Sequence, residues 1–175
     1  MKIKLHLAVV FLLITKTYAQ LPIGQNEITS FSRSKYGAGA QNWAMAQDKN
    51  NRLYVANNEG LLVFDGTNWQ IFPVPNKTIV RSIEFGEDGK LYTGAQDELG
   101  YFAPDNVGRL QFTSLKNLLP ATERNFPDVW QIEVAGKEVF FRTNTTIFRL
   151  YEGRINAFRS NSTWLSMHKH QGVIV

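Results

Sequence analysis

The side chains in this chain that could carry out catalysis are few. His168 and His170 stand two apart, so on a strand they would project from one face and could begin a metal site. A third ligand would still be needed, and the chain has no cysteine. Asp97 and Glu98 are adjacent carboxylates, but neighbours on a strand point to opposite sides and cannot flank one glycosidic bond. We therefore predict no catalytic residue, no metal site and no cofactor.

Ligand binding has better support, because polar runs recur after strand-like segments. The runs are Asn57-Asn58-Glu59, Gln96-Asp97-Glu98 and Thr143-Asn144-Thr145. Amides and carboxylates beside indole rings suit sugar hydroxyls and the apolar faces of sugar rings. The candidate ligand-binding residues are Asn57, Asn58, Glu59, Gln96, Asp97, Glu98, Trp43 and Trp130. Ordinary polar turns and aromatic packing remain the alternative interpretation.

The elements that must position these residues belong to an internal repeat. Three segments align, beginning at Trp43-Ala-Met-Ala-Gln, Arg81-Ser-Ile-Glu-Phe and Trp130-Gln-Ile-Glu-Val, and a fourth begins at Leu165. Tyr54, Tyr92, Phe140 and Ile174 occupy matching places, spaced by 38, 48 and 34 residues. Each unit holds short β-type runs separated by turns such as Asp65-Gly66 and Asp88-Gly89.

A repeat of about 40 residues made of short strands predicts an all-β fold, a partial β-propeller with about three four-stranded blades and the start of a fourth. A β-sandwich is the alternative, but sandwiches do not repeat one strand pattern at this period. We expect blades at about 43–78, 79–115 and 129–160, with the next from 164, after an irregular lead-in over 20–42. Residues 115–128 are expected to form a short helix or loop. In a propeller of such blades the polar runs would gather around the mouth of the channel.

The first nineteen residues read as a signal peptide. Lys2 and Lys4 precede an apolar run from Leu5 to Ile14, and Thr17-Tyr18-Ala19 offers small residues for cleavage. Its loss, which also removes Lys16, lowers the net charge from +4 to +1. A nearly neutral chain has no electrostatic footprint for nucleic acid, so we expect none to bind here. We also expect export and no membrane span in the mature segment.

Three stretches resemble a known family. They are Phe31 to Trp43, YVANNEGLLVFDGTNW from Tyr54 to Trp69, and LYTGAQDELGYFAPD from Leu91 to Asp105. They resemble the N-terminal part of the two-component regulator propeller proteins of Bacteroidetes, and the likeness covers residues 20–175. The third unit departs from the pattern, with Arg142-Thr-Asn-Thr-Thr where the first has Ala56-Asn-Asn-Glu-Gly, which weakens the expectation of a ligand contact there.

The resemblance implies an exported, periplasmic sensor that belongs to an inner-membrane protein. Members of the family carry one or two large propellers, a triple-tyrosine β-sandwich, one membrane helix and a helix-turn-helix or histidine-kinase output. Many of them respond to glycan fragments. The implied function is therefore non-catalytic ligand sensing, with an extracellular oligosaccharide or other small ligand as the partner of the full-length protein.

Two alternatives stay open. The chain could begin an exported propeller enzyme, a hydrolase or a lyase, or it could be a truncated fragment with no activity of its own. Because the repeat count falls below the roughly four to eight blades that close a propeller, we expect an N-terminal piece of a longer protein. Such a piece would need further blades or self-association to cover its exposed sheet faces.

Overall fold

The computed structural model describes Gly24 and residues 28–175 of the chain. Within this part, Phe31–Val175 form one compact unit. The predicted signal peptide, residues 1–19, lies outside the described residues. No helix among the described residues has both the length and the apolar character needed to cross a bilayer.

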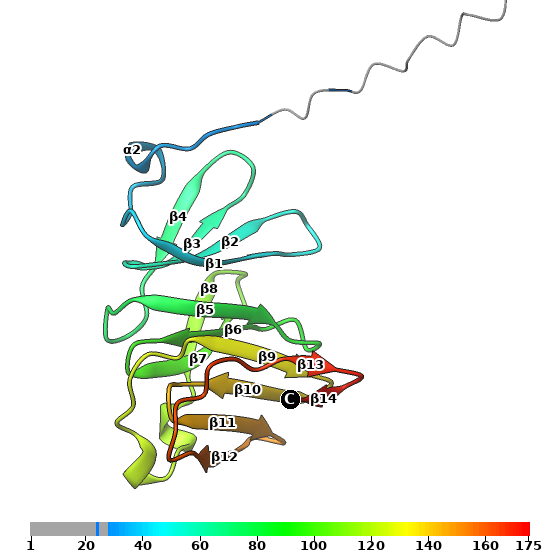
Figure 1. Ribbon diagram of the computed structural model, residues 1–175. Helices are drawn as coiled ribbons and strands as arrows, with labels where there is room; N and C mark the ends of the chain where they lie inside the picture. Colours follow the sequence, from blue (N-terminus) through cyan, green and yellow to red (C-terminus); the bar gives the residue numbers. More distant parts are fainter. Residues whose placement is uncertain (1–23, 25–27) are drawn as a thin grey trace, which may run out of the picture. The chain divides into compact units, whose positions relative to one another are not determined.

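In the described part of the chain, three antiparallel sheets of four strands follow one another, each with its strands in sequence order (Figure 1). Blade 1 contains β1 (Asn42–Gln47), β2 (Leu53–Asn57), β3 (Gly60–Phe64) and β4 (Trp69–Phe72). Blade 2 contains β5 (Val80–Phe85), β6 (Leu91–Ala95), β7 (Glu98–Pro104) and β8 (Leu110–Ser114). Blade 3 contains β9 (Gln131–Ala135), β10 (Glu138–Arg142), β11 (Thr146–Tyr151) and β12 (Arg154–Arg159). A hairpin of β13 (Lys169–His170) and β14 (Val173–Ile174) follows.

The sheets are arranged as propeller blades, which confirms the predicted fold class. The first strands of the three blades, β1, β5 and β9, lie side by side, and the later strands of each blade lead away from them (Figure 1). One apolar core lies between blades 1 and 2, and a second lies between blades 2 and 3. Consecutive residues of one strand point to opposite faces and therefore enter different cores. Leu91 of β6 lies in the first core, whereas Tyr92 lies in the second.

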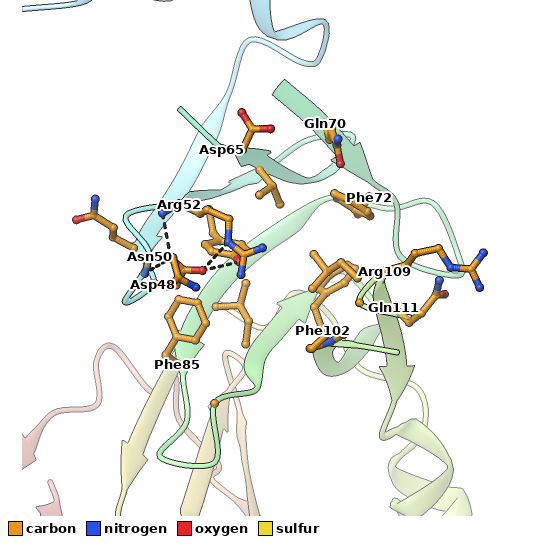
Figure 2. Close-up of a pocket in the computed structure, with 18 of the residues that line it drawn as sticks. Asp48, Asn50, Arg52, Asp65, Gln70, Phe72, Phe85, Phe102, Arg109 and Gln111 are labelled. Atoms are coloured by element: carbon orange, nitrogen blue, oxygen red, sulfur yellow. Dashed lines mark hydrogen bonds and ion pairs between the residues drawn. The ribbon is translucent and has the colours of Figure 1, made fainter. Parts of the chain in front are cut away.

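An aspartate holds the turn between the first two strands of blades 1 and 2. Asp48 Oδ1 accepts hydrogen bonds from the backbone N–H groups of Asn50 and Arg52, both at 2.9 Å. Its Oδ2 accepts from Arg52 Nε at 2.7 Å and from the Tyr54 hydroxyl at 3.1 Å (Figure 2). Asp88 repeats this arrangement in blade 2, with contacts to the Lys90 side chain and the Tyr92 hydroxyl. Such local carboxylate bonds fix a tight turn and the register of the hairpin.

The connection between blades 2 and 3 contributes to the core. It contains two short 3-10 helices, η1 (Lys116–Leu118) and η2 (Ala121–Glu123). Leu115, Leu119 and Phe126 from this connection are buried against blade 3, where the Phe126 ring meets Phe148 at a centroid distance of 5.2 Å. The segment therefore matches the predicted short helix or loop, and it also packs between the two sheets.

The lead-in covers the face of blade 1 that points away from blade 2. It contains a helix of one turn, α2 (Arg33–Tyr36), which ends at Gly37 in the left-handed conformation. Ala38 is buried against Val55 and Leu62, with Tyr36 and Trp69 beside them. Residues 31–40 thus shield the apolar residues of this sheet face from water.

Candidate functional site

Three matched positions in the repeat bring Trp43, Arg81 and Trp130 together. The residue that directly follows each of them pairs with an equivalent position on the second strand of its blade. These pairs are Ala44 with Ala56, Ser82 with Gly94, and Gln131 with Arg142. The register of β1 and β5 shifts at Trp43 and Arg81, which is the signature of a β-bulge and turns a side chain out of the regular alternation. Since β1, β5 and β9 lie side by side, the three side chains meet at one end of these strands.

The two indole rings form a corner that holds the guanidinium group. The Trp43 and Trp130 rings meet edge to face, with centroids 6.1 Å apart and planes at 72°. Arg81 Cζ lies 3.9 Å from the centroid of Trp43 and 4.8 Å from that of Trp130. Both distances are within the range of cation–π attraction. We call this group, Trp43, Arg81 and Trp130, the Trp–Arg–Trp corner.

Polar neighbours hold the corner in place. Arg81 Nε donates a hydrogen bond to Asp128 Oδ1 at 2.8 Å, and both side chains are largely buried, with 11% and 16% exposed. Arg81 Nη1 is buried and has no hydrogen-bond partner among the described residues. Trp43 Nε1 donates to Asn58 Oδ1 at 2.7 Å, while Asn58 Nδ2 donates to Gln41 Oε1 at 3.2 Å. Trp43 and Trp130 remain 38% and 36% exposed as whole residues, so they are accessible to a ligand.

Asn57, one of the predicted ligand-binding residues, does not lie at the surface. It is the last residue of β2 and is fully buried. Its Nδ2 donates to the Gly39 and Gln41 carbonyls and to Asn42 Oδ1, and its Oδ1 accepts from the backbone N–H groups of Gly39 and Glu59. Asn57 therefore fastens the lead-in to blade 1, and the structure leaves it no surface to offer a ligand. Glu59, two residues on, is exposed.

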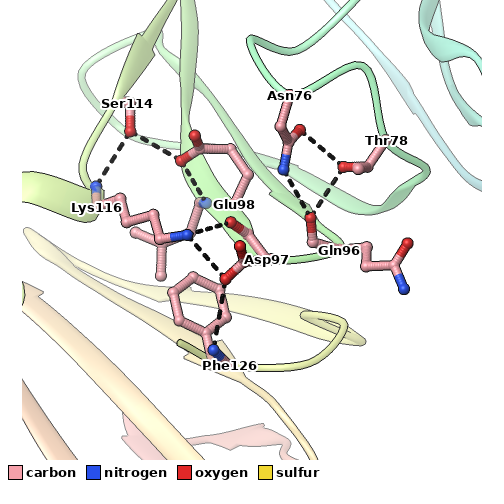
Figure 3. A network of polar contacts seen from close by, with 9 residues as sticks. Asn76, Thr78, Gln96, Asp97, Glu98, Ser114, Lys116 and Phe126 are labelled. Carbon is pink, nitrogen blue, oxygen red and sulfur yellow. Dashed lines mark hydrogen bonds and ion pairs between the residues drawn. The ribbon is translucent and has the colours of Figure 1, made fainter. Parts of the chain in front are cut away.

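The polar run of blade 2 is divided between surface and core (Figure 3). Gln96 is exposed, and its backbone carbonyl accepts hydrogen bonds from Asn76 Nδ2 and Thr78 Oγ1. Asp97 pairs with Lys116 at 2.8 Å and has a positive φ of 54°. Glu98 is the first residue of β7 and is buried, with Oε1 accepting from the Leu99 N–H and the Ser114 hydroxyl. Burial raises the pKa of Glu98, an effect that these two hydrogen bonds and Lys116 partly oppose.

The structure thus groups some of the predicted residues and separates others. Trp43, Trp130 and Asn58 lie together, whereas Asn57 and Glu98 are buried strand residues rather than loop residues. Sequence reasoning missed Arg81 and Asp128. The repeat alignment contained the signal for Arg81, because it places this residue in the same column as Trp43 and Trp130.

The two histidines considered for metal binding lie at the hairpin that follows blade 3. His168 and His170 are both exposed. Across the part of the chain that the structure describes, no three His, Cys, Asp or Glu side chains come close enough together to hold a metal ion.

Comparison with known proteins extends the fold assignment. No protein-family model and no curated protein sequence matches the chain. The extracellular domain assigned to the hybrid two component system BT3049 from B. thetaiotaomicron matches with a TM-score of 0.60 at 14% identity, over 88% of this chain and 22% of that one. The extracellular domain assigned to the one component system BT4673 from the same organism matches with a TM-score of 0.55 at 17% identity, over 77% and 19%.

The chain therefore spans about a fifth of the length of these two solved structures. At this level of identity the likeness shows the shared fold. Virginiamycin B lyase from Staphylococcus aureus also matches, over 69% of this chain and 41% of that one, but its TM-score of 0.48 at 14% identity is too low to bear on activity.

Proposed function

We propose that this chain is a non-catalytic, ligand-sensing propeller segment of an exported signal-transduction protein, and that its ligand is a glycan bound at the Trp–Arg–Trp corner. The observation that carries the proposal is the meeting of three matched repeat positions in one partly exposed aromatic and cationic group. Two solved structures that share the fold are extracellular domains of bacterial regulatory systems, which supports a role outside the cytoplasm.

The chemistry of the corner suits a sugar. A pyranose ring presents an apolar C–H face and an edge of hydroxyl groups, which need an aromatic surface and directional donors and acceptors. Trp43 and Trp130 supply the surface, and Asn58, which accepts from Trp43, supplies an amide group. A second amide belongs to the exposed Gln96, whose backbone is bridged to Asp128, the partner of Arg81. The contacts to Asn58 and Arg81 hold the rings before a ligand arrives, which lowers the entropy lost on binding.

The proposal places the chain in the periplasm as the receptor part of a membrane-anchored regulator, with the triple-tyrosine domain and the DNA-binding or kinase output on the remainder of that protein. Further blades, or a second copy of the chain, would cover the outer face of blade 3. That face presents Phe158 and Tyr151, which are 49% and 37% exposed. Apolar side chains grouped on one sheet face favour such a contact.

Isothermal titration calorimetry with a glycan panel tests this function. The probes are soluble oligosaccharides prepared from starch, xylan, mannan, arabinan, pectin and chondroitin. At least one should bind the full chain, and Trp43→Ala and Trp130→Ala should each weaken that binding tenfold or more, since stacked aromatic rings dominate such sites.

Phe158→Ala is the matched control, because it removes an exposed aromatic ring from β12, away from the corner. It should leave the affinity unchanged. Absence of binding by every member of the panel, or equal affinity of native chain and both tryptophan variants, would contradict the proposed function.

A further inference from the structure

A second candidate site lies between blades 1 and 2, at the opposite end of β1 from the Trp–Arg–Trp corner. It is a cleft of about 1130 Å³ bordered by the turns that follow β1 and β5 (Figure 2). The Asp48 turn and the segment from Gly86 to Gly89 form part of its rim. Its volume is slightly above the roughly 300–1,000 Å³ typical of small-molecule clefts.

The repeat explains why the cleft exists here. Tyr54 of β2 pairs across the sheet with Val63 of β3, whereas the matching Tyr92 of β6 pairs with Tyr101 of β7. The Tyr92 and Tyr101 rings lie 5.9 Å apart and help to fill the space between blades 2 and 3. Blade 1 presents the much shorter Val63 toward blade 2, and Val63 lines the cleft. A small side chain at a position that elsewhere holds a tyrosine leaves a volume that the protein does not fill.

Aromatic rings form the apolar wall of the cleft. Phe72 of β4, Phe85 of β5 and Phe112 of β8 line it and are only half-buried. Phe102 lies behind them, with centroids 6.5 Å from Phe72 and 5.0 Å from Phe112 in edge-to-face contacts. Half-buried rings held by packed neighbours offer rigid apolar surface at little entropic cost.

The charged groups at the rim balance one another. The lining cations are Lys49, Arg52 and Arg109, and the lining acids are Asp48, Asp65 and Glu87. Arg52 is paired with Asp48 at 2.7 Å, and Arg109 with Asp105 at 3.0 Å. Since the two arginines are already paired, the cleft has no strong field of either sign to select an ionic ligand.

Uncharged polar groups complete the lining. The side-chain amide of Gln70, on the face of β4 that points toward blade 2, makes no hydrogen bond to another described residue, and neither does that of Asn50. Each amide can donate and accept hydrogen bonds at once, as a hydroxyl-rich ligand requires.

From this combination we infer that the cleft between blades 1 and 2 binds a neutral oligosaccharide. Aromatic walls, unengaged amides and balanced charge match the apolar ring faces and hydroxyl edges of uncharged sugars. The assignment is independent of the proposed function, because it uses none of the residues of the Trp–Arg–Trp corner and requires no signalling role.

Methyl NMR of the full chain tests the inference with four neutral probes: cellotetraose, xylotetraose, mannotetraose and maltotetraose. At least one should shift the methyl resonances of Val63 and Leu110, both of which line the cleft. Val63→Tyr, which installs the residue found at the matching place in blade 2, should fill the cleft and weaken binding tenfold or more. Gln70→Ala should weaken it about threefold or more and does not depend on how the larger substitution folds.

Ile71→Tyr is the matched control, because it adds a ring of the same size on the opposite face of β4, where Ile71 is 40% exposed. It should leave the shifts unchanged. The inference is overturned if none of the four probes shifts these methyl groups, or if the Gln70→Ala chain binds as tightly as the native chain. It is equally overturned if tetragalacturonate binds in preference to the neutral probes, or if a second copy of the chain occupies the cleft and sedimentation shows Val63→Tyr abolishing that dimer.

Discussion

The indole rings of Trp43 and Trp130 meet edge to face, 6.1 Å between centroids, although one belongs to the first blade and the other to the third. Arg81, from the blade between them, lies over both rings. Residues in or next to the first strands of all three blades thus form one group, because Trp130 directly precedes β9. The contacts within this group therefore join all three blades. The corner is both the proposed ligand platform and a tie between blades.

The Arg81–Asp128 pair is expected to contribute measurably to stability. Arg81→Ala leaves the largely buried Asp128 carboxylate without its partner and removes the cation from both indoles, so the free energy of unfolding should fall by about 3–5 kcal/mol. Urea unfolding followed by circular dichroism measures the change. Arg159→Ala, which removes an arginine 63% exposed from its pair with Glu123, should cost about 1 kcal/mol or less. Equal losses in the two variants would contradict this role of Arg81.

The Asp48–Tyr54 hydrogen bond is expected to stabilise the turn between β1 and β2. Tyr54→Phe removes one hydrogen bond to a charged acceptor and should lower the free energy of unfolding by about 1.5–3 kcal/mol. Tyr101→Phe is the matched control, because the Tyr101 hydroxyl makes no hydrogen bond to another described side chain, and its cost should be within about 0.5 kcal/mol of zero. Chemical denaturation of both variants decides the matter, and a Tyr54→Phe chain as stable as native would refute the bond's contribution.

Asp48 should also make stability depend on pH. Burial alone would raise the pKa of Asp48, but hydrogen bonds from Arg52, Asn50 and Tyr54 outweigh it and lower the pKa below its usual value. A carboxyl group whose pKa is lowered by folding stabilises the folded state at neutral pH, and this contribution is lost as the pH falls through the lowered pKa. The difference in unfolding free energy between the native chain and Asp48→Asn should therefore shrink on acidification from pH 7 to pH 3. A difference that stays constant over this range would contradict the shift.

For Glu98 we expect the opposite dependence of stability on pH. Its pKa is raised by burial, so the folded state holds the proton more tightly than the unfolded state does, and stability falls as the pH rises through the raised pKa. Glu98→Gln keeps an oxygen that can accept from the Leu99 N–H and the Ser114 hydroxyl but removes the buried charge. The variant should be more stable than native at pH 7, with the gain vanishing in acid. Thermal unfolding at pH 7 and in acid measures both stabilities. Glu87→Gln, at an exposed position, is the control and should leave stability unchanged at either pH.

Asn57 should be essential for holding the lead-in on blade 1. Asn57→Ala leaves the buried N–H and carbonyl of Gly39, and the carbonyl of Gln41, without their partner, at a cost of about 2–4 kcal/mol. Hydrogen exchange should then accelerate at the Gly39 amide, which donates to Asn57 in the native chain. Asn58→Ala, at a half-buried neighbour, should leave that amide protected. Unchanged exchange at Gly39 in the Asn57 variant would show that apolar packing alone holds the segment.

Sequence reasoning predicted the blades well because period-two strands and aspartate-glycine turns are local signals. The all-β propeller architecture followed from residues such as Tyr54 and Tyr92, which recur in register and take equivalent places in the two cores. The turn aspartates are local too: Asp48 and Asp88 come with Tyr54 and Tyr92, and blade 3 has Phe140 at this place and no aspartate in its turn.

The burial of individual polar residues could not be predicted in this way. Asn57 and Asn58 are identical in type and adjacent, yet one is fully buried and the other supports Trp43 at the surface. The difference arises from the lead-in, whose residues Gly39 and Gln41 precede Asn57 by 18 and 16 positions and fold back over it. Arg81 was missed for a related reason. A single arginine in a strand forms no motif, and its role depends on its contacts with Trp43 and Trp130 from two other blades.

Indole NMR tests the central claim most directly, because the Nε1–H groups of the four tryptophans give separate signals. Titration of the full chain with the glycan panel should shift the signals of Trp43 and Trp130 together, while those of Trp69 and Trp164, whose Nε1 atoms are buried, stay in place. That result would locate glycan binding at the Trp–Arg–Trp corner. Signals of Trp43 and Trp130 that remain unmoved by every glycan at millimolar concentration would contradict it.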